Sequence, residues 1–320
     1  TDFEHSGCDY TADDVIAEFA SDNPENFLFP FMEGVISNLK TLGKIRTSET
    51  YAATLCSFRR FREDKDVTLD DMDSDMMMAY EAYLKNNGVS PNSSSFYMRN
   101  LRAVYNRAVE KGLTSQRFPF KHVYTGVDKT VKRAVPLKVI KRIKEMDFSM
   151  NPSFDFARDM FLMSFYTRGM SFVDMAYLRK KDLQNGVLSY RRRKTGQQLF
   201  IKWEKCMQEI VDKYDTSQSN YLLPIIKPFG DIDERKQYIY AAHNINRCLK
   251  IIGKELGLSV SLTLYVARHA WASIAKSKNV PLSVISEGMG HDSEATTRIY
   301  LASLDTVAID KANSMILKSL

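Results

Sequence analysis

Apolar residues recur at helical intervals through most of this 320-residue chain, and this periodicity constrains the fold more than any other feature of the sequence. Tyr51, Leu55, Phe58 and Phe61, for example, would share one face of a helix. The period changes once, in GVLSYRRRKTGQQLFIKW, where two β-rich runs flank a turn at Lys194–Gly196. We therefore predict a mainly α-helical protein of the α+β class, with a small β-hairpin or sheet in its second half.

Local signals mark where several helices begin and end. We expect one helix to begin near Asp73 and to stop at Gly88, because glycine commonly ends helices. The next should have Ser90 as its N-cap, because a serine oxygen accepts a hydrogen bond from an exposed helix N–H group. A later helix opens in SFVDM, where Ser171 and Asp174 have the spacing of a capping box.

The length of the chain favours two domains. The stretch TGVDKTVKRAVPL is basic, contains glycine and proline, and has little apolar content, as is typical of a linker. We predict four segments: an acidic N-terminal segment over 1–24, a helical domain over 25–126, a basic linker over 127–134, and a second domain over 135–320 that ends in a tail helix.

The net charge of +6 is distributed unevenly along the chain. Residues 1–39 contain nine acids and no Lys or Arg, whereas residues 179–205 contain nine basic residues against two acids, a local charge of +7. Such a concentration is typical of a polyanion-binding protein, with an ordinary solvated face as the plainer alternative. The candidate DNA contacts lie on the hairpin, on a first-half helix and in the linker: Arg191, Arg192, Arg193, Arg99, Arg102, Lys132 and Arg133.

The sequence lacks the motifs of several common enzyme classes. The sequence has no glycine-rich phosphate loop, no His-Glu-x-x-His, no paired cysteines and no Gly-x-Ser-x-Gly. We therefore predict no metal and no cofactor. The four scattered cysteines favour reduced thiols, and no apolar run reaches the length of a membrane span, so we expect a cytoplasmic protein without a membrane partner.

The second half offers a set of residues suited to phosphoryl transfer: Arg168, Lys194, Arg268, His291 and Tyr300. Two arginines can grip a phosphate and stabilise the charge of its transition state. A lysine can protonate a departing alkoxide, and a histidine can bind the non-bridging oxygens. A tyrosine, with a reference pKa of about 10, becomes a nucleophile when positive charge surrounds it. This set predicts attack on a DNA phosphodiester with formation of a phosphotyrosyl bond.

Two segments of the chain carry a family resemblance. LYVARHAWAS, followed by VISEGMGHDSEATTRIYLA, resembles the C-terminal signature of the tyrosine recombinase, or phage integrase, family. Arg268, His291 and Tyr300 match that signature residue by residue, with Tyr300 nine residues after His291, and Lys194 matches the hairpin lysine of the family. The resemblance covers roughly 25–320, and TRGMSFVDMAYLRKKDL is similar to the branch carried by mobile elements of anaerobic gut bacteria.

The resemblance implies more than the residues alone do. It implies a two-domain clamp around DNA, with 25–126 as the core-binding domain and 135–320 as the catalytic domain. It implies site-specific recombination through a 3′-phosphotyrosyl intermediate, without a cofactor. The implied partners are double-stranded recombination sites, a homotetramer on synapsed DNA formed from monomers, and accessory DNA-bending proteins, and the implied location is the nucleoid when DNA is bound.

The sequence departs from the family pattern at two places. Tyr265 stands where the family has a histidine, and we expect a structural or phosphate-touching role for it, because a phenol is a poor base at neutral pH. Ser171, three residues before Asp174, stands where the family has its first arginine. We assign that role to Arg168 in the preceding loop, in preference to Arg158.

Two other functions remain open from the sequence. One is a type IB topoisomerase-like enzyme, which would relax DNA without choosing a sequence. The other is a non-catalytic DNA-binding protein of the same fold, in which Tyr300 is an ordinary core tyrosine and His291 an ordinary helix cap.

Two structural expectations concern the C-terminal part. Gly288 and Gly290 should let the chain turn so that His291 faces the phosphate. Apolar residues after Tyr300 recur at helical intervals, which predicts an amphipathic tail helix from about Asp305. That helix would pack on its own domain or on a neighbouring protomer.

Overall fold

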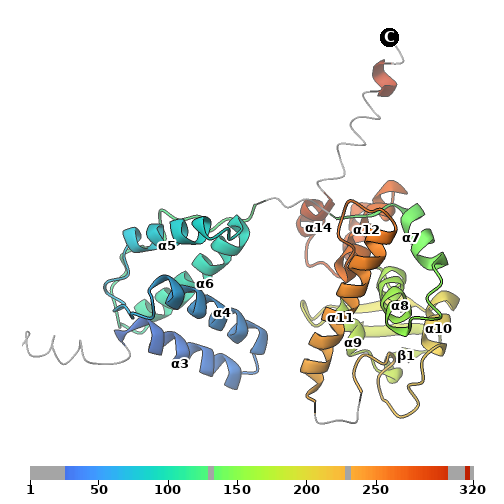
Figure 1. Ribbon diagram of the computed structural model, residues 1–320, viewed down its shortest axis with the longest axis horizontal. Helices are drawn as coiled ribbons and strands as arrows, with labels where there is room; N and C mark the ends of the chain where they lie inside the picture. Colours follow the sequence, from blue (N-terminus) through green and yellow to red (C-terminus); the bar gives the residue numbers. More distant parts are fainter. Residues whose placement is uncertain (1–25, 129–132, 228–231, 302–313, 318–320) are drawn as a thin grey trace, which may run out of the picture. The chain divides into compact units, whose positions relative to one another are not determined.

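The computed structural model describes residues 26–128, 133–227, 232–301 and 314–317. It divides the chain into two compact units, Thr1–Thr130 and Val131–Leu320 (Figure 1). The mainly α-helical fold with one small sheet, predicted from the periodicity, is confirmed. Within the described ranges, no helix combines the length and the apolarity that crossing a membrane would require.

The first unit is built from helices whose ends follow the local signals in the sequence. They are α3 (Leu28–Thr41), α4 (Ile45–Phe61), α5 (Ser74–Asn86) and α6 (Pro91–Glu110). The Asp73 carboxylate accepts a hydrogen bond from the N–H of Met76 at 2.8 Å, and the hydroxyl of Ser90 accepts one from the N–H of Ser93. Gly88 has a left-handed φ of 70° just after α5. The predicted ends of these helices are therefore confirmed.

Aromatic packing fills the core of the first unit. The rings of Phe58 on α4 and Tyr80 on α5 meet edge to face, with centroids 5.1 Å apart. Phe61 lies at the same 5.1 Å from Tyr80, and the Tyr80 hydroxyl donates to Ser57 at 2.8 Å, so its polar end is satisfied inside the core. The apolar face predicted for α4 is thus the face that packs.

The second unit combines helices with a three-stranded sheet. Its helices are α7 (Leu137–Glu145), α8 (Pro152–Tyr166), α9 (Phe172–Ala176), α10 (Lys205–Asp212), α11 (Glu234–Glu255), α12 (Leu264–Ser277), α13 (Leu282–Gly288) and α14 (Glu294–Leu301), with a short 3-10 turn η2 (Lys180–Asp182). The strands are β1 (Leu183–Gln184), β2 (Val187–Arg191) and β3 (Gln198–Lys202), antiparallel and in the order β1-β2-β3.

The sheet contains the hairpin expected from the change of period. Its register pairs Leu188 with Ile201 and Tyr190 with Leu199, and all four of these side chains are buried on one face. Alternation along β2 and β3 therefore leaves their other face toward solvent. The turn between the strands holds Lys194. The two-residue strand β1 is too short to leave a pattern in the sequence.

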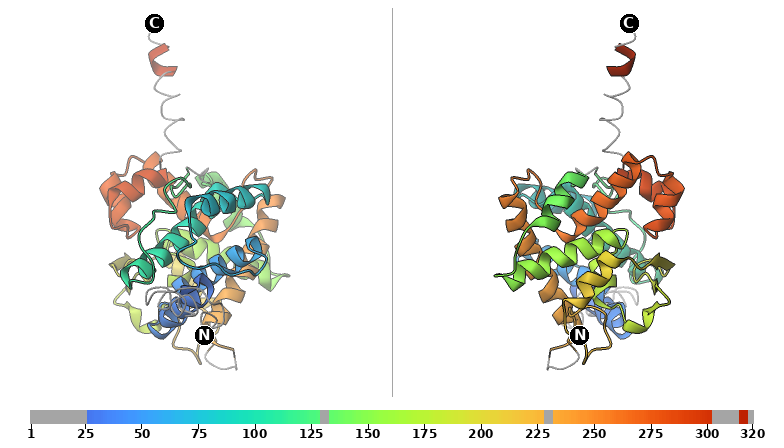
Figure 2. Two further views of the ribbon diagram at one scale, coloured as in Figure 1. Left: turned by 90° about the vertical axis from the view of Figure 1, so that its left-hand side faces the viewer. Right: turned by 90° about the vertical axis from the view of Figure 1, so that its right-hand side faces the viewer.

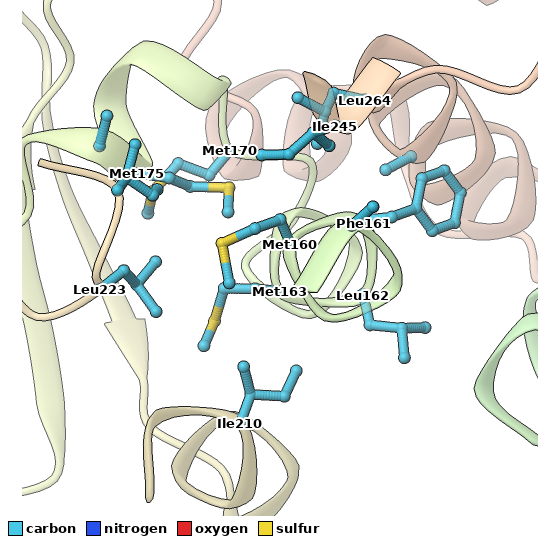
Figure 3. Packing of buried hydrophobic residues seen from close by; sticks show 14 of the residues in the cluster. Met160, Phe161, Leu162, Met163, Met170, Met175, Ile210, Leu223, Ile245 and Leu264 are labelled. Carbon is cyan, nitrogen blue, oxygen red and sulfur yellow. The ribbon is translucent and has the colours of Figure 1, made fainter. Parts of the chain in front are cut away.

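Helix α8 runs through the centre of the second unit. Met160, Phe161 and Met163 on this helix are fully buried, so it is apolar around most of its circumference (Figure 3). Figure 3 shows Ile210 of α10 below it and Leu264 of α12 above it. Helix α8 contacts α10, α11 and α12. The loop that follows α8 lies against α12, where Gly169 meets Arg268.

A smaller apolar cluster supports the last helices of this unit. Ala272 of α12, Ile285 of α13, Met289 and Leu301 of α14 are all buried together. Figures 1 and 2 show α13 and α14, coloured orange to red, lying side by side. The backbone of α14, which carries Tyr300, is therefore held against α12 and α13.

Two local expectations are wrong. The Ser171 hydroxyl donates to the carboxylate of Asp174 and accepts no backbone cap bond, so the predicted capping box does not form. Gly288 is the last residue of α13 and has no left-handed φ, whereas Gly290 has a φ of 64°. The turn before His291 is therefore made at Gly290 alone.

The predicted tail helix lies mostly outside the described residues, including the apolar positions at Val307, Ala308 and Ala312. Residues 314–317 are helical, and Met315 and Ile316 there are exposed by 69% and 62%.

Candidate active site

The guanidinium of Arg268 is the centre of the site. Arg268 lies on α12 and is only 6% exposed. Its Nη1 donates to the carbonyl oxygen of Gly169 and its Nη2 to that of Met289, each at 2.7 Å. The same Nη2 lies 2.9 Å from Nε2 of His291. Backbone carbonyls thus satisfy a charged group that would otherwise be costly to bury.

The approach of Gly169 to Arg268 leaves no room for a side chain. A Cβ at position 169 would stand 2.7 Å from Cα of Arg268 and 2.8 Å from its Cγ. Gly169 also has a φ of 75°, and its neighbour Arg168 has a φ of 61°. The left-handed turn after α8 therefore requires glycine at 169, both for its conformation and for its contact.

A hydrogen bond to α11 fixes the first residue of α12. The backbone N–H of Leu264, the first residue of α12, donates to the side-chain oxygen of Asn246 on α11 at 2.9 Å. Because Arg268 lies about one turn further along α12, this bond helps to set the position of the guanidinium.

The hydrogen bonds of His291 fix its tautomer. A guanidinium can only donate, so Nε2 of His291 must accept from Arg268. Nδ1 then carries the proton and donates to the hydroxyl of Thr297 at 2.7 Å. Burial, and then the charges of Arg268, Arg192 and Lys194, lower the pKa of His291 to about 4. His291 is therefore a neutral imidazole at neutral pH.

Helix α14 carries both a partner of His291 and Tyr300. Thr297, fully buried, is on this helix, three residues before Tyr300. The backbone of α14 is thus tied to the imidazole through the Thr297 hydroxyl. The side chain of Tyr300 itself lies outside what the structure describes.

Three contacts hold the hairpin turn in place. The backbone N–H of Arg193 donates to the buried carboxylate of Asp174 at 2.9 Å, and the Arg193 guanidinium lies 4.0 Å over the ring of Tyr177. Arg192 is only 7% exposed, and its Nη1 donates to the carbonyl oxygen of Gly290. The exposed Lys194 follows directly in the chain.

A cavity of about 630 Å³ brings most of the predicted residues together. Its wall includes Ser171, Arg192, Lys194, Tyr265, Arg268 and His291. Tyr265 is 59% exposed, and its ring packs edge to face on His269 with centroids 4.6 Å apart. In the described part of the chain, neither Arg168 nor Arg158 lines this cavity.

The two candidates for the first arginine have different surroundings. Arg158 pairs with Asp155 and with Asp159, the latter at 2.9 Å, and its Nη1 donates to a carbonyl at 2.6 Å, so its charge is neutralised within a closed network. Burial raises the pKa of Tyr190, and the positive charges of Arg268, Arg192 and Arg168 all lower it. Arg168 therefore acts electrostatically on the same tyrosine as the two arginines that line the cavity. Arg168 is thus the candidate near the cavity.

The other predicted DNA contacts have varied surroundings. Nη1 of Arg99 donates to the carbonyl of Gly126 at 3.0 Å, and Nη1 of Arg102 donates to the hydroxyl of Thr125 at 3.3 Å. Arg99 is half-buried, so only part of its donor set faces solvent. The exposed Arg191 donates to Gly196 at 2.8 Å, Arg133 is exposed, and Lys132 lies outside the described residues.

Sequence reasoning missed the roles of two residues that organise the site. Thr297 fixes the tautomer of His291, and Asp174 anchors the hairpin through the N–H of Arg193. The capping-box spacing singled out Asp174 but pointed to the wrong partner. For Thr297, the signal in the sequence is its place in the family signature, between His291 and Tyr300.

The chain matches two family profiles. The phage integrase SAM-like domain matches residues 27–123, and the phage integrase family matches residues 137–306, which is more than half of the chain. A comparison with curated protein sequences finds no match.

Solved structures similar to the chain share its fold at low sequence identity. A lambda integrase dimer bound to a COC′ core site has a TM-score of 0.68 at 17% identity, covering 92% of this chain and 82% of that one. The XerH recombinase on a palindromic difH substrate has a TM-score of 0.62 at 17% identity, covering 88% and 83%. The Tn1549 transposon integrase with circular intermediate DNA has a TM-score of 0.59 at 15% identity, covering 84% and 94%.

The fold is that of the two-domain tyrosine recombinases. The chain belongs to the phage integrase family and is a tyrosine site-specific recombinase, as the resemblance predicted.

The environment of His291 predicts a dependence of stability on pH. Its pKa of about 4 lies below the ordinary histidine value of 6.5, so the unfolded chain binds a proton more readily than the folded chain between these values. The neutral, buried imidazole of His291 therefore contributes to the free energy of unfolding. This contribution is complete above about pH 6.5, and it should be lost as the pH falls toward 4.

Urea unfolding of the wild type and of His291→Gln at pH 7.5 and 5.0 measures this contribution. The stability lost on acidification should be smaller in the variant, which has no titrating imidazole. An equal loss in both proteins, or an NMR titration that places the pKa of His291 near 6.5, would contradict the proposed surroundings.

Proposed function

We propose that this protein cuts and rejoins DNA at two specific sites, with Tyr300 as the nucleophile that forms a 3′-phosphotyrosyl intermediate. The observation that carries the proposal is the shared cavity wall of Arg268, His291 and Lys194, beside the helix that bears Tyr300. Membership of the phage integrase family supports the same reaction.

The proposed step balances without a cofactor or metal. The phenolic oxygen of Tyr300 bonds to phosphorus, and the phenolic proton passes to water. The bond between phosphorus and the 5′ oxygen breaks, and that oxygen takes a proton from the ammonium of Lys194. Arg268 stabilises the additional negative charge on the non-bridging oxygens. Rejoining is the reverse reaction, with the 5′ hydroxyl of a second strand as the nucleophile.

The neutral tautomer of His291 suits a role in holding the phosphate site together. Its Nε2 accepts from Arg268, so it orients the guanidinium rather than adding charge. With a pKa of about 4, it is a weak base, and we assign it to positioning and not to removal of the phenolic proton.

For the first arginine we propose Arg168. Its charge acts on Tyr190 together with that of Arg268, whereas the Arg158 guanidinium is neutralised by Asp155 and Asp159. For Tyr265 we propose a hydrogen bond from its exposed phenol to a phosphate, since it lines the cavity.

We propose double-stranded DNA as the partner, bound by basic residues of both units. The named contacts are Arg191, Arg192 and Arg193 on the hairpin, Arg99 and Arg102 on α6, and Lys132 and Arg133 in the connector. Such contacts release counterions, so affinity should fall steeply as the salt concentration rises.

For the assembly we propose a monomer in free solution and a homotetramer on two synapsed sites, with accessory DNA-bending proteins. A lambda integrase tetramer bound to a Holliday junction, with a TM-score of 0.67 at 17% identity, supports this assembly by analogy. The exposed apolar residues at 315–317 support contact of the tail with a neighbouring protomer. Sedimentation with one-site and two-site DNA, with and without the residues after Asp305, tests both points.

Integration or excision of a mobile element is the proposed use, and the Tn1549 transposon integrase is the similar protein that supports it. The protein would then work in the cytoplasm, associated with the nucleoid when DNA is bound.

Covalent trapping tests the proposed chemistry. A nicked suicide substrate loses the short strand that would reverse cleavage, so the wild type should accumulate a protein–DNA adduct that survives denaturant. Tyr300→Phe should form no adduct while its affinity for the same DNA stays within a few-fold of the wild type, because the hydroxyl is the nucleophile. An adduct of undiminished yield with Tyr300→Phe would refute the assignment, and no adduct with the wild type would favour a binding protein without chemistry.

The role of Lys194 can be separated from phosphate binding by changing the leaving group. Lys194→Ala should slow cleavage by roughly 10²- to 10⁴-fold when the leaving group is a 5′ oxygen, because that alkoxide needs a proton. A 5′ bridging sulfur leaves without protonation, so its rate should be nearly equal in variant and wild type. If the sulfur substrate is cleaved as slowly as the oxygen substrate by Lys194→Ala, the lysine only binds the phosphate.

A further inference from the structure

The hairpin turn holds polar atoms that its own fold leaves unsatisfied. Nε of Arg192, Oγ1 of Thr195 and Oε1 of Gln197 are buried, and within the described ranges none of them has a hydrogen-bond partner. Arg192 and Thr195 also line the cavity that holds Arg268 and His291. A buried N–H group without a partner is unfavourable, so an arginine of this kind in a cavity wall points to a ligand.

Arg192 is held in the same way as Arg268. Their exposed fractions are 7% and 6%, and both are anchored by backbone carbonyls. Arg268 donates to the carbonyl of Met289, and Arg192 donates to the next carbonyl along the chain, that of Gly290. Two guanidinium groups from separate elements therefore donate to the turn at Met289–Gly290. Both arginines also line the same cavity.

Arg192 keeps donors that its anchor does not use. A guanidinium has five N–H groups, and the bond to Gly290 takes one of those on Nη1. The Nε–H has no partner in the described part of the chain. The Nε–H itself is covered, so a phosphate in the cavity would meet the terminal N–H groups that the bond to Gly290 does not use, and such groups bind phosphate oxygens.

The charges around the cavity also favour an anion at Arg192. Of the residues that the structure describes, Asp292 is the one acid in the cavity wall, where Arg192, Lys194 and Arg268 outnumber it. The Asp174 carboxylate accepts from the N–H of Arg193 and from the hydroxyl of Ser171. It makes no ion pair with Arg192 among the described residues. The charge of Arg192 is instead felt at His291, where it lowers the pKa together with Arg268.

We propose that Arg192 is a phosphate-contacting catalytic residue, whose guanidinium binds a non-bridging oxygen of the scissile phosphate beside Arg268. This inference rests on the proposed function, and it adds a residue to the site described there. As the Tyr300 oxygen bonds to phosphorus and the 5′ oxygen departs with a proton from Lys194, Arg192 stabilises the charge that builds up on the non-bridging oxygens. It also explains why the turn bearing Lys194 is fastened to the residue before His291.

The alternative is that Arg192 only fastens the hairpin to Gly290. A methylphosphonate linkage separates the two roles, because a methyl group replaces one non-bridging oxygen and removes the negative charge. A variant that lacks a phosphate-binding charge should recover on this neutral linkage. A variant whose site is merely misplaced should stay slow on both linkages.

The experiment uses the full chain on suicide substrates that carry either a phosphate or a methylphosphonate at the cleavage position. Arg192→Ala should cleave the phosphate roughly 10²- to 10³-fold more slowly than the wild type. On the methylphosphonate the variant should come within about tenfold of the wild type. The linkage lacks the negative charge that the missing guanidinium would have stabilised. Arg142→Ala, which removes an exposed arginine of α7 in the same unit, should match the wild type on both.

Equal slowing of Arg192→Ala on both linkages, or no slowing on the phosphate, would overturn the proposal. Arg192→Gln, which keeps an N–H donor for Gly290 but no charge, serves if the alanine variant does not fold and should show the same recovery. Absence of any adduct with the wild type on the phosphate substrate would instead refute the proposed function itself.

Discussion

The site depends on one buried charge. The guanidinium of Arg268 is almost fully removed from solvent, and such a group is tolerated only where acceptors surround it. Those acceptors come from the loop after α8, through Gly169, and from the turn after α13, through Met289. Three distant parts of the sequence must therefore meet for Arg268 to be buried, and their meeting creates the cavity.

The same guanidinium determines the state of its neighbour. Because Arg268 can only donate, His291 must accept at Nε2 and must donate at Nδ1 to Thr297 on α14. Burial and positive charge keep the imidazole neutral. A chain of directed contacts thus runs from α12 through His291 to the helix that carries Tyr300. Preorganisation of this kind lets a site act without rearranging its dipoles during the reaction.

Much of this could be predicted from the sequence, because it depends on local patterns. Helical periodicity predicted the fold, and the spacing of His291 and Tyr300 led to the family. The burial of Arg192 and the bond between His291 and Thr297 could not be predicted, since each depends on the contact of segments that periodicity does not place side by side. The expectation that Gly288 makes the turn before His291 is wrong because a glycine can also end a helix, as Gly288 does in α13.

The contact between Gly169 and Arg268 gives the most direct test of this account. Gly169→Ala would push a methyl group into the backbone of α12, and a displacement of about 1 Å can cost roughly 10² in rate. Gly257→Ala is the matched control, since Gly257 has a similar φ of 68° but nothing within 4 Å of its Cβ position. The account predicts that single-turnover cleavage falls about 100-fold in the first variant and little in the second, with DNA affinity retained in both. Cleavage by Gly169→Ala at the rate of the control would contradict it.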